Sequence, residues 1–173
     1  MVEFIPPQED LIIEGHHPNT ANSVLELHRL LAIFLASKSF SALRINFPGE
    51  GFDPIYQIQE VEEDEITRLL LTLAITARVI DDREGRTLEK LGSRCGQIEN
   101  FSKEEDIQDL NLREACNKII HAKKIRFDRD GGDVDYHFNP TIYLYGEQRG
   151  VPWKATLEIV EFSKEYYSLV CHF

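Results

Sequence analysis

Residues 111–145 read NLREACNKIIHAKKIRFDRDGGDVDYHFNPTIYLY, and the hydrophobic pattern of the chain changes within them. Before Lys123, apolar residues recur every three or four positions, which is typical of an amphipathic helix. After it, apolar and polar residues alternate, which is typical of a strand with one buried face. Gly131-Gly132 predicts a hairpin turn between two such strands. The stretch therefore predicts a helix that ends near Ala122 and is followed by antiparallel strands.

Upstream of this stretch, the same reasoning predicts three further helices. The first starts near Ser23, which has the spacing of a capping box with Glu26. The second opens on the acidic residues 62–65, which the helix dipole favours, and runs to about Ile80. The third is predicted from apolar residues at helical spacing: Leu88, Leu91, Cys95 and Ile98. A short strand is predicted at residues 11–13.

Downstream, alternating apolar residues predict two more strands, at residues 142–145 and 153–159, with a turn at 146–150. Residues 161–169 predict a short helix, although their aromatic content also permits a strand. Helices and strands thus come in blocks, which is typical of an α+β protein.

The chain of 173 residues suits one domain, residues 1–173. We expect an N-terminal helical bundle, at about residues 20–122, followed by a C-terminal antiparallel β-meander, at about residues 124–160.

The composition narrows the classes of protein that fit. The formal net charge is −11, so the surface as a whole repels phosphate backbones and broad RNA binding is disfavoured. RNA binding would need a local basic patch, and residues 113–129 are the most basic stretch. The three cysteines form no C-x-x-C pair, so neither a zinc site nor a disulfide framework is expected. The start, MVEFIPPQEDLIIEG, lacks the basic region of a signal peptide, and no apolar run is long enough to span a bilayer. We expect a cytoplasmic protein with no membrane partner.

Three polar residues of the helix that ends near Ala122 form the best candidate for a site. Arg113, Asn117 and His121 are four positions apart, so they lie along one side of the helix, at the border of its apolar stripe. A histidine at such a rim can do acid–base work, an asparagine can orient a substrate, and an arginine can stabilise a phosphate. Arg78 joins Arg113 and His121 if its helix packs against this one. A structural role also fits, since Asn and His at a helix edge often hydrogen-bond a neighbouring loop.

The hexapeptide from Cys116 to His121, C-N-K-I-I-H, resembles the R-N-x-x-x-H signature of HEPN-type proteins. The resemblance implies a small helical bundle, often dimeric, of the kind found in toxin–antitoxin and antiviral systems. In active members, the arginine and histidine of two subunits meet at a dimer cleft and cut RNA without a metal. Carried onto this chain, the polar position is Asn117 and the histidine is His121. Cys116 occupies the arginine position, and Arg113 lies one turn earlier.

Two functions from different classes follow. In the first, the chain is a HEPN-like, non-catalytic interaction protein that keeps its bundle for homodimerisation and uses its sheet for a partner, such as another protein. Cys116 and the net charge of −11 favour this function. In the alternative, it is a metal-independent ribonuclease in which His121 is the general acid/base, Asn117 orients the substrate and Arg113 contacts phosphate. The line of three residues and the basic stretch favour the alternative.

The remaining sequence patterns predict neither a metal site nor a cofactor site. The acidic residues between 128 and 135 lack the glycine and glutamate that an EF-hand loop needs at its sixth and twelfth positions. His16-His17 has no further ligand set beside it. Aromatic residues gather in the C-terminal part: Tyr143, Tyr145, Trp153, Tyr166 and Tyr167. They either pack the sheet onto its helices or form an exposed surface for nucleic acid or a partner.

Overall fold

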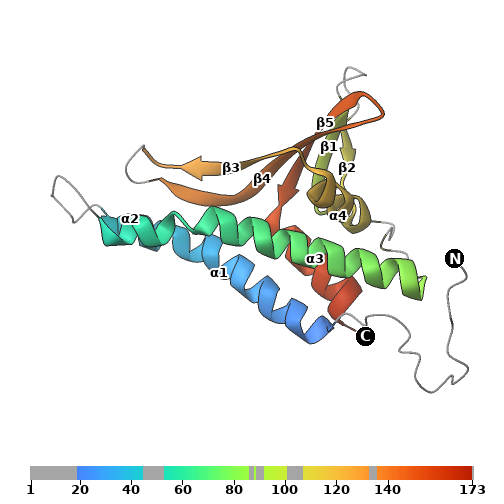
Figure 1. Cartoon of the computed structure of the whole chain (residues 1–173), viewed down its shortest axis with the longest axis horizontal. Helices are drawn as coiled ribbons and strands as arrows, with labels where there is room; N and C mark the ends of the chain where they lie inside the picture. The colour runs from blue at the N-terminus through green and yellow to red at the C-terminus, as the bar shows by residue number, and fades with distance from the viewer. Residues whose placement is uncertain are drawn as a thin grey trace, which may run out of the picture.

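The computed structural model describes residues 19–44, 53–85, 88, 92–100, 107–132 and 136–172. The elements follow in the order α1 (Thr20–Arg44), α2 (Pro54–Gln59), α3 (Glu62–Glu84), β1 (Gly96–Asn100), β2 (Ile107–Asp109), α4 (Leu112–His121), β3 (Lys124–Asp130), β4 (His137–Gln148), β5 (Val151–Glu158), α5 (Ile159–Tyr166) and the π-helix η2 (Tyr167–Cys171). The predicted α+β class is confirmed (Figure 1). The strand predicted at residues 11–13 and the pair His16-His17 lie outside the described residues.

Local chemistry explains where the helices begin and end. The side chain of Asn111 accepts a hydrogen bond from the Glu114 backbone N–H at 2.8 Å, which caps α4 as predicted. α4 ends before Ala122, also as predicted. The predicted start of the first helix is wrong by three residues, because Asn19 caps it and Ser23 lies buried inside it. Buried Ser23 instead accepts a hydrogen bond from the Tyr166 hydroxyl.

Five antiparallel strands form one sheet in the order β2-β1-β5-β4-β3. The helix predicted from Leu88 to Ile98 is therefore wrong: none of its described residues is helical, and its C-terminal end is strand β1. Gly96 explains the difference: with φ at 148°, it lies so close to β5 that a Cβ atom would stand 1.9 Å from the Thr156 carbonyl oxygen. The sheet thus includes two strands that precede α4, in addition to the meander. The separate strands predicted before and after Pro140 are wrong, because they form one strand, β4. Leu91 lies outside the described residues.

Tight turns connect the three strands of the meander. Gln148 pairs with Val151, so Arg149 and Gly150 alone form the turn between β4 and β5. Both have positive φ, 53° and 80°, as a two-residue hairpin of this kind requires. The β3–β4 hairpin turns near Gly131, which has a φ of 100°.

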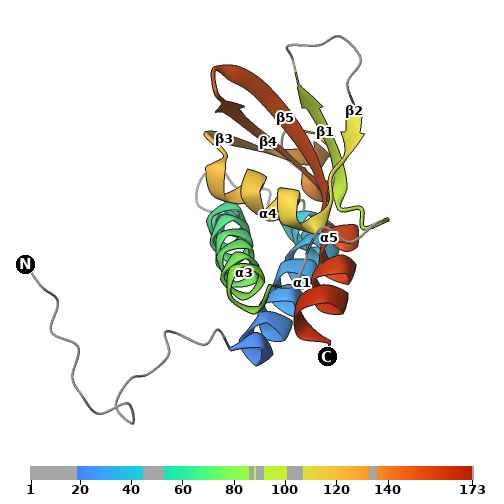
Figure 2. The ribbon, with the colours of Figure 1, turned by 90° about the vertical axis from the view of Figure 1, so that its right-hand side faces the viewer.

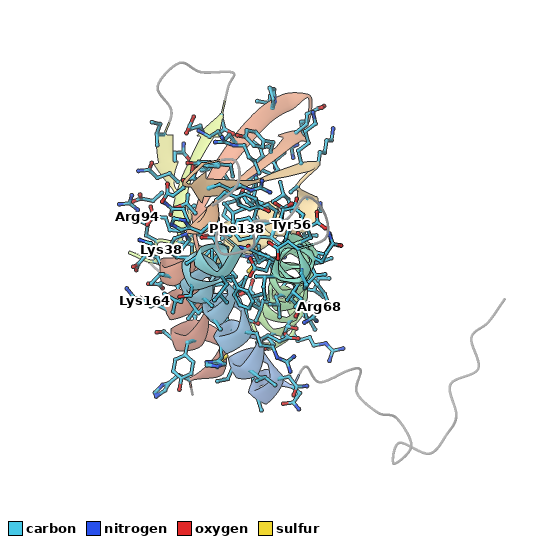
Figure 3. The ribbon with its side chains drawn as sticks, turned by 90° about the vertical axis from the view of Figure 1, so that its left-hand side faces the viewer. Lys38, Tyr56, Arg68, Arg94, Phe138 and Lys164 are labelled. Atoms are coloured by element: carbon cyan, nitrogen blue, oxygen red, sulfur yellow. The ribbon has the colours of Figure 1, made fainter. Side chains whose placement is uncertain are left out.

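The molecule has a sheet layer and a helix layer. Figures 1 and 2 show α1, α3 and α5 below the sheet, with α4 between the sheet and α3. Phe138 of β4 lies where the layers meet (Figure 3), and its ring centroid is 6.4 Å from that of Phe34 in α1. Within the described part of the chain, no helix or strand covers the opposite face of the sheet (Figure 2). None of the described helices combines the length and apolar character needed to cross a membrane.

Candidate functional site: the flank of α4 and the open sheet face

Arg113, Asn117 and His121 lie along α4 as predicted, but the side chain of Arg113 is bound to the C-terminal end of α3. The Nε of Arg113 donates to Asp81 Oδ2 at 2.8 Å, and its Nη2 lies 3.7 Å from Asp82 Oδ1. Both aspartates lie in the last turn of α3, so Arg113 links α4 to α3 by ion pairs. Arg78 joins Arg113 in this cluster, with Nη2 3.1 Å from Asp82 Oδ1, but the prediction that it also joins His121 is wrong, because His121 lines a separate cavity. His121 lies eight residues beyond Arg113, which is about 12 Å along a helix.

Asn117 and His121 open instead onto a cavity between α4 and the β4–β5 hairpin. Its volume is about 460 Å³, and its described lining residues are Glu114, Asn117, Lys118, His121, Lys123, Glu147, Gln148, Arg149 and Trp153. Arg113 and Arg78 are not among these residues. The structure therefore brings together two of the three predicted site residues and separates the third.

A buried lysine forms the floor of this cavity. Lys118 is 5% exposed, and its Nζ lies 2.9 Å from Glu114 Oε1 and 3.3 Å from Gln148 Oε1. The ammonium group also lies 4.6 Å from the centre of the Trp153 ring. Partial burial alone would raise the pKa of Glu114, but hydrogen bonds from Lys118 and Asn117 hold it below its ordinary value. A sequence-based search for a site misses Lys118, because a lysine usually lies on the solvated side of a helix.

The mouth of the cavity is mostly cationic. Lys123 pairs with Glu147 at 3.0 Å, whereas Arg149 forms no ion pair with any described residue. His121 is exposed. The arrangement can attract an anion, and His121 is the group that could exchange a proton with one.

Cys116 has no part in this cavity. It is fully buried, and burial raises the pKa of its thiol to about 12. Position 116 therefore belongs to the hydrophobic core, where neither a thiolate nor a charged side chain is accommodated.

The aromatic residues of the C-terminal part divide between three places. Trp153 and Tyr166 are buried, and Tyr167 is exposed on the helix layer. Ile142 and Leu144 alternate with the two tyrosines along β4 and are buried in the core. Tyr143 and Tyr145 therefore point to the other, open face of the sheet. The sequence alone could not separate these groups, since aromatic residues occur on both faces of a strand.

Two rows of side chains cross the open sheet face. Strand pairing aligns Arg126, Tyr143, Thr156 and Gln97 in one row, and Lys124, Tyr145, Lys154 and Glu99 in the next. The Arg126 guanidinium lies 4.2 Å from the centre of the Tyr143 ring, and the Lys154 ammonium 5.5 Å from it. Lys154 also pairs with Glu99 at 3.0 Å. Lys124 and Arg126 have no acidic partner among the described residues. We call these eight residues the open-face rows.

The basic stretch 113–129 is therefore divided by the fold. Arg113 binds the acidic residues in the last turn of α3, and Lys118 is buried. Lys123 lines the cavity between α4 and the β4–β5 hairpin, which we call the α4 cavity. Lys124 and Arg126 lie on the open sheet face. Arg129 bonds to Glu63 of α3 and lies over the ring of Tyr136. No continuous basic surface results from the described members of this stretch.

Comparison of the chain with models of protein families, with curated proteins and with solved structures finds no match. Among the described residues, no three or more His, Cys, Asp or Glu side chains are grouped so that they could hold a metal ion.

Proposed function

We propose that the chain is a HEPN-like, non-catalytic interaction protein, which dimerises through its helix layer and presents its open sheet face to a partner. The HEPN resemblance is supported by the placement of Asn117 and His121 on one helix, facing one cavity. It would place the protein in a toxin–antitoxin or antiviral system.

The observation that carries the proposal is a strip of apolar side chains on the outside of the helix layer. Val24, Leu31 and Leu35 of α1 are seven and four residues apart, so they form one stripe, and Leu35 is 75% exposed. Val160 and Tyr167, which follow β5, are 37% and 45% exposed and line a cavity of about 430 Å³ with Val24 and Leu31. We call these five residues the α1–α5 strip.

A second copy of the chain is the occupant that this strip fits. Apolar residues seven and four positions apart line one side of a helix, and such a stripe can pack against the same stripe of a second helix. α1 has 25 residues and is therefore about 37 Å long, enough to support a two-fold interface of ordinary size. On α1, Glu26 is the only acidic residue, so the α1 part of the strip carries little negative charge.

The arrangement of α4 supports the absence of catalysis. Arg113 makes its ion pairs with the end of α3, and Cys116 lies in the core. A ribonuclease site of the HEPN kind needs an arginine beside the histidine, and neither of these two positions supplies one.

Sedimentation velocity over a range of concentrations tests the proposed dimer. We expect a dimer for the wild type and a monomer for Leu35→Glu, because a carboxylate at this exposed position disfavours apolar association without entering the core. Leu71→Glu is the matched control: Leu71 is 41% exposed but lies on α3, outside the strip, and should leave the dimer intact. A wild type that remains monomeric at every concentration would contradict the proposal.

One observation favours the ribonuclease as a second candidate. His121 and Asn117 share their cavity with Lys123 and with Arg149 of the β4–β5 turn, so cations that could contact a phosphate lie at the same cavity. A cleavage assay on labelled RNA, free of divalent metal, compares the wild type with His121→Ala. We expect no cleavage by either protein. Cleavage by the wild type that His121→Ala abolishes would replace the non-catalytic function with this one.

A further inference from the structure

We infer that the open sheet face binds single-stranded nucleic acid, with Tyr143 and Tyr145 each stacking on one base. The inference rests on the proposed function, because it takes this face as the surface left for a partner. It is independent of the α1–α5 strip, which lies on the helix layer, away from the sheet (Figure 2).

The spacing of the two rings fits two successive bases. Tyr143 and Tyr145 are two residues apart on β4, so they point to the same side of the sheet, about 6.8 Å apart. An extended strand of nucleic acid can place neighbouring bases on such a pair, and every base offers a face for stacking. Neither tyrosine hydroxyl is bonded to a described residue, so each remains free to bond to a base or a sugar.

Cations stand beside each ring where phosphates would pass. Lys124 and Lys154 flank Tyr145 on the neighbouring strands, and Arg126 flanks Tyr143. Neighbouring strands are about 4.8 Å apart, so a phosphate next to a stacked base would lie within reach of these groups. Lys124 and Arg126 have no acidic partner among the described residues, and both can bind phosphate without first breaking an ion pair.

The net charge of −11 does not prevent such local binding. At physiological ionic strength, charges more than about 8 Å apart in solvent are largely screened. A phosphate at Lys124 therefore interacts mainly with the open-face rows, whose charged members are Lys124, Arg126, Lys154 and Glu99, and with Glu147, the next residue of this face on β4, which pairs with Lys123. Glu158 follows on β5, opposite Thr141, and limits the favourable surface at that end.

The chemistry of this face fits a nucleic acid better than a protein. A tyrosine at the centre of a protein interface is usually surrounded by apolar groups that exclude water. The cross-strand neighbours of Tyr143 are Arg126 and Thr156, which are charged and polar. The two tyrosines lie on β4, which already pairs with β3 on one side and β5 on the other, so a partner strand cannot pair with β4 itself.

Tyr145 should contribute more than Tyr143. Arg126 already lies over the Tyr143 ring at 4.2 Å, so a base must displace the guanidinium or use the other part of the ring. The Tyr145 ring has no such group among the described residues.

Fluorescence anisotropy with labelled oligouridine and oligothymidine of about twelve nucleotides tests the inference at about 50 mM salt, where phosphate contacts are strong. We expect both to bind the full-length protein more tightly than a duplex of the same length. Tyr145→Ala should weaken binding about tenfold, and Tyr143→Ala somewhat less. Tyr145→Phe keeps the ring and should keep most of the affinity. Lys124→Gln should weaken binding and reduce its dependence on salt.

Leu71→Ala is the control, because Leu71 is exposed on α3, outside both the open sheet face and the α1–α5 strip, and should not affect binding. The inference is overturned if neither oligonucleotide binds, or if Tyr145→Ala and Tyr143→Ala bind as tightly as the wild type. Leu35→Glu separates this result from the proposed dimer. A monomeric Leu35→Glu protein that still binds the oligonucleotides supports both the proposed dimer and nucleic-acid binding. A wild type that forms a dimer but binds no oligonucleotide overturns only the inferred nucleic-acid binding.

Discussion

At the scale of single residues, Gly146 makes room for the only tryptophan of the chain. A Cβ atom on Gly146 would lie 2.2 Å from Cζ2 of Trp153, the residue with which it pairs across β4 and β5. The indole ring thereby lies against the β4 backbone and beneath the Lys118 ammonium group. The absence of a side chain at Gly146 thus allows Trp153 to lie beneath Lys118 in the α4 cavity.

We therefore expect Gly146→Ala to destabilise the protein by about 2 kcal/mol, because the new methyl group must push the indole out of its place. Urea unfolding followed by far-ultraviolet circular dichroism measures this change. The double variant Gly146→Ala/Trp153→Phe should lose less than the sum of the two single changes, since the smaller ring relieves the clash. Strictly additive losses would show that the two residues do not compete for space.

The ion pair between Glu114 and Lys118 predicts a dependence of stability on pH. Because the pKa of Glu114 is lowered in the folded protein, its ionised form stabilises the fold above the ordinary value of 4.5, and this stabilisation is lost as the pH falls. Glu114→Gln leaves the buried Lys118 without its carboxylate. We expect the variant to be about 1 kcal/mol less stable than the wild type at neutral pH.

This difference should shrink towards zero as the pH falls below the ordinary value of 4.5 and then through the lowered pKa of Glu114, where the wild-type side chain also becomes neutral. Urea unfolding at several pH values measures it. Glu161→Gln is the control, because Glu161 pairs with Lys164 on the exposed surface of α5 and such pairs contribute little. A difference between wild type and Glu114→Gln that is independent of pH would refute the role given to the ionised carboxylate.

At the scale of elements, the cap of α4 determines where this helix begins. Asn111 has an extended backbone, and its side chain accepts the Glu114 N–H at 2.8 Å. Asn111→Ala should cost about 1 kcal/mol, the usual loss for removal of such a cap. Thermal or urea unfolding measures this loss. Asn22→Ala, an exposed change inside α1, should cost nothing; equal losses from both changes would mean that the cap has no special role.

The elements that the sequence predicted well are those whose ends carry local signals. The acidic first turn of α3 and the Asn111 cap of α4 are such signals, and both helices were placed correctly. The short helix α2 was missed, although Asp53 caps it and Pro54 opens it, because six residues are too few for a periodic pattern. β1 was taken for a helix because its pairing with β5 depends on residues about 60 positions away in the chain.

The same limit applies to the candidate site. The periodicity of α4 correctly placed Asn117 and His121 beside each other at one cavity. It could not show that Arg113 turns towards α3, because its partner Asp81 lies 32 residues earlier in the sequence. Which tyrosines face solvent also depended on which side of the sheet the helices cover.

At the scale of the whole molecule, the carboxylate of Asp81 in α3 binds both α4 and the connection that leads to β1. Asp81 Oδ2 accepts from Arg113 Nε of α4 at 2.8 Å and lies 3.5 Å from Arg78 Nη1 of α3. Asp81 Oδ1 accepts from the Leu88 backbone N–H at 3.0 Å, in the connection that leads to β1. Asp81 is buried, so water cannot replace these partners.

Asp81→Asn keeps the shape of this side chain but removes its charge and directs an N–H group towards one of its donors. We expect a loss of about 2 kcal/mol in the free energy of unfolding, the range for buried hydrogen bonds to a charged group. Urea unfolding measures it. Asp82→Asn is the matched control: Asp82 meets the same arginines at 3.1 and 3.7 Å but is exposed, and solvent weakens such pairs to less than about 1 kcal/mol. If the two variants lose equal stability, burial of Asp81 is not what holds α3 and α4 together.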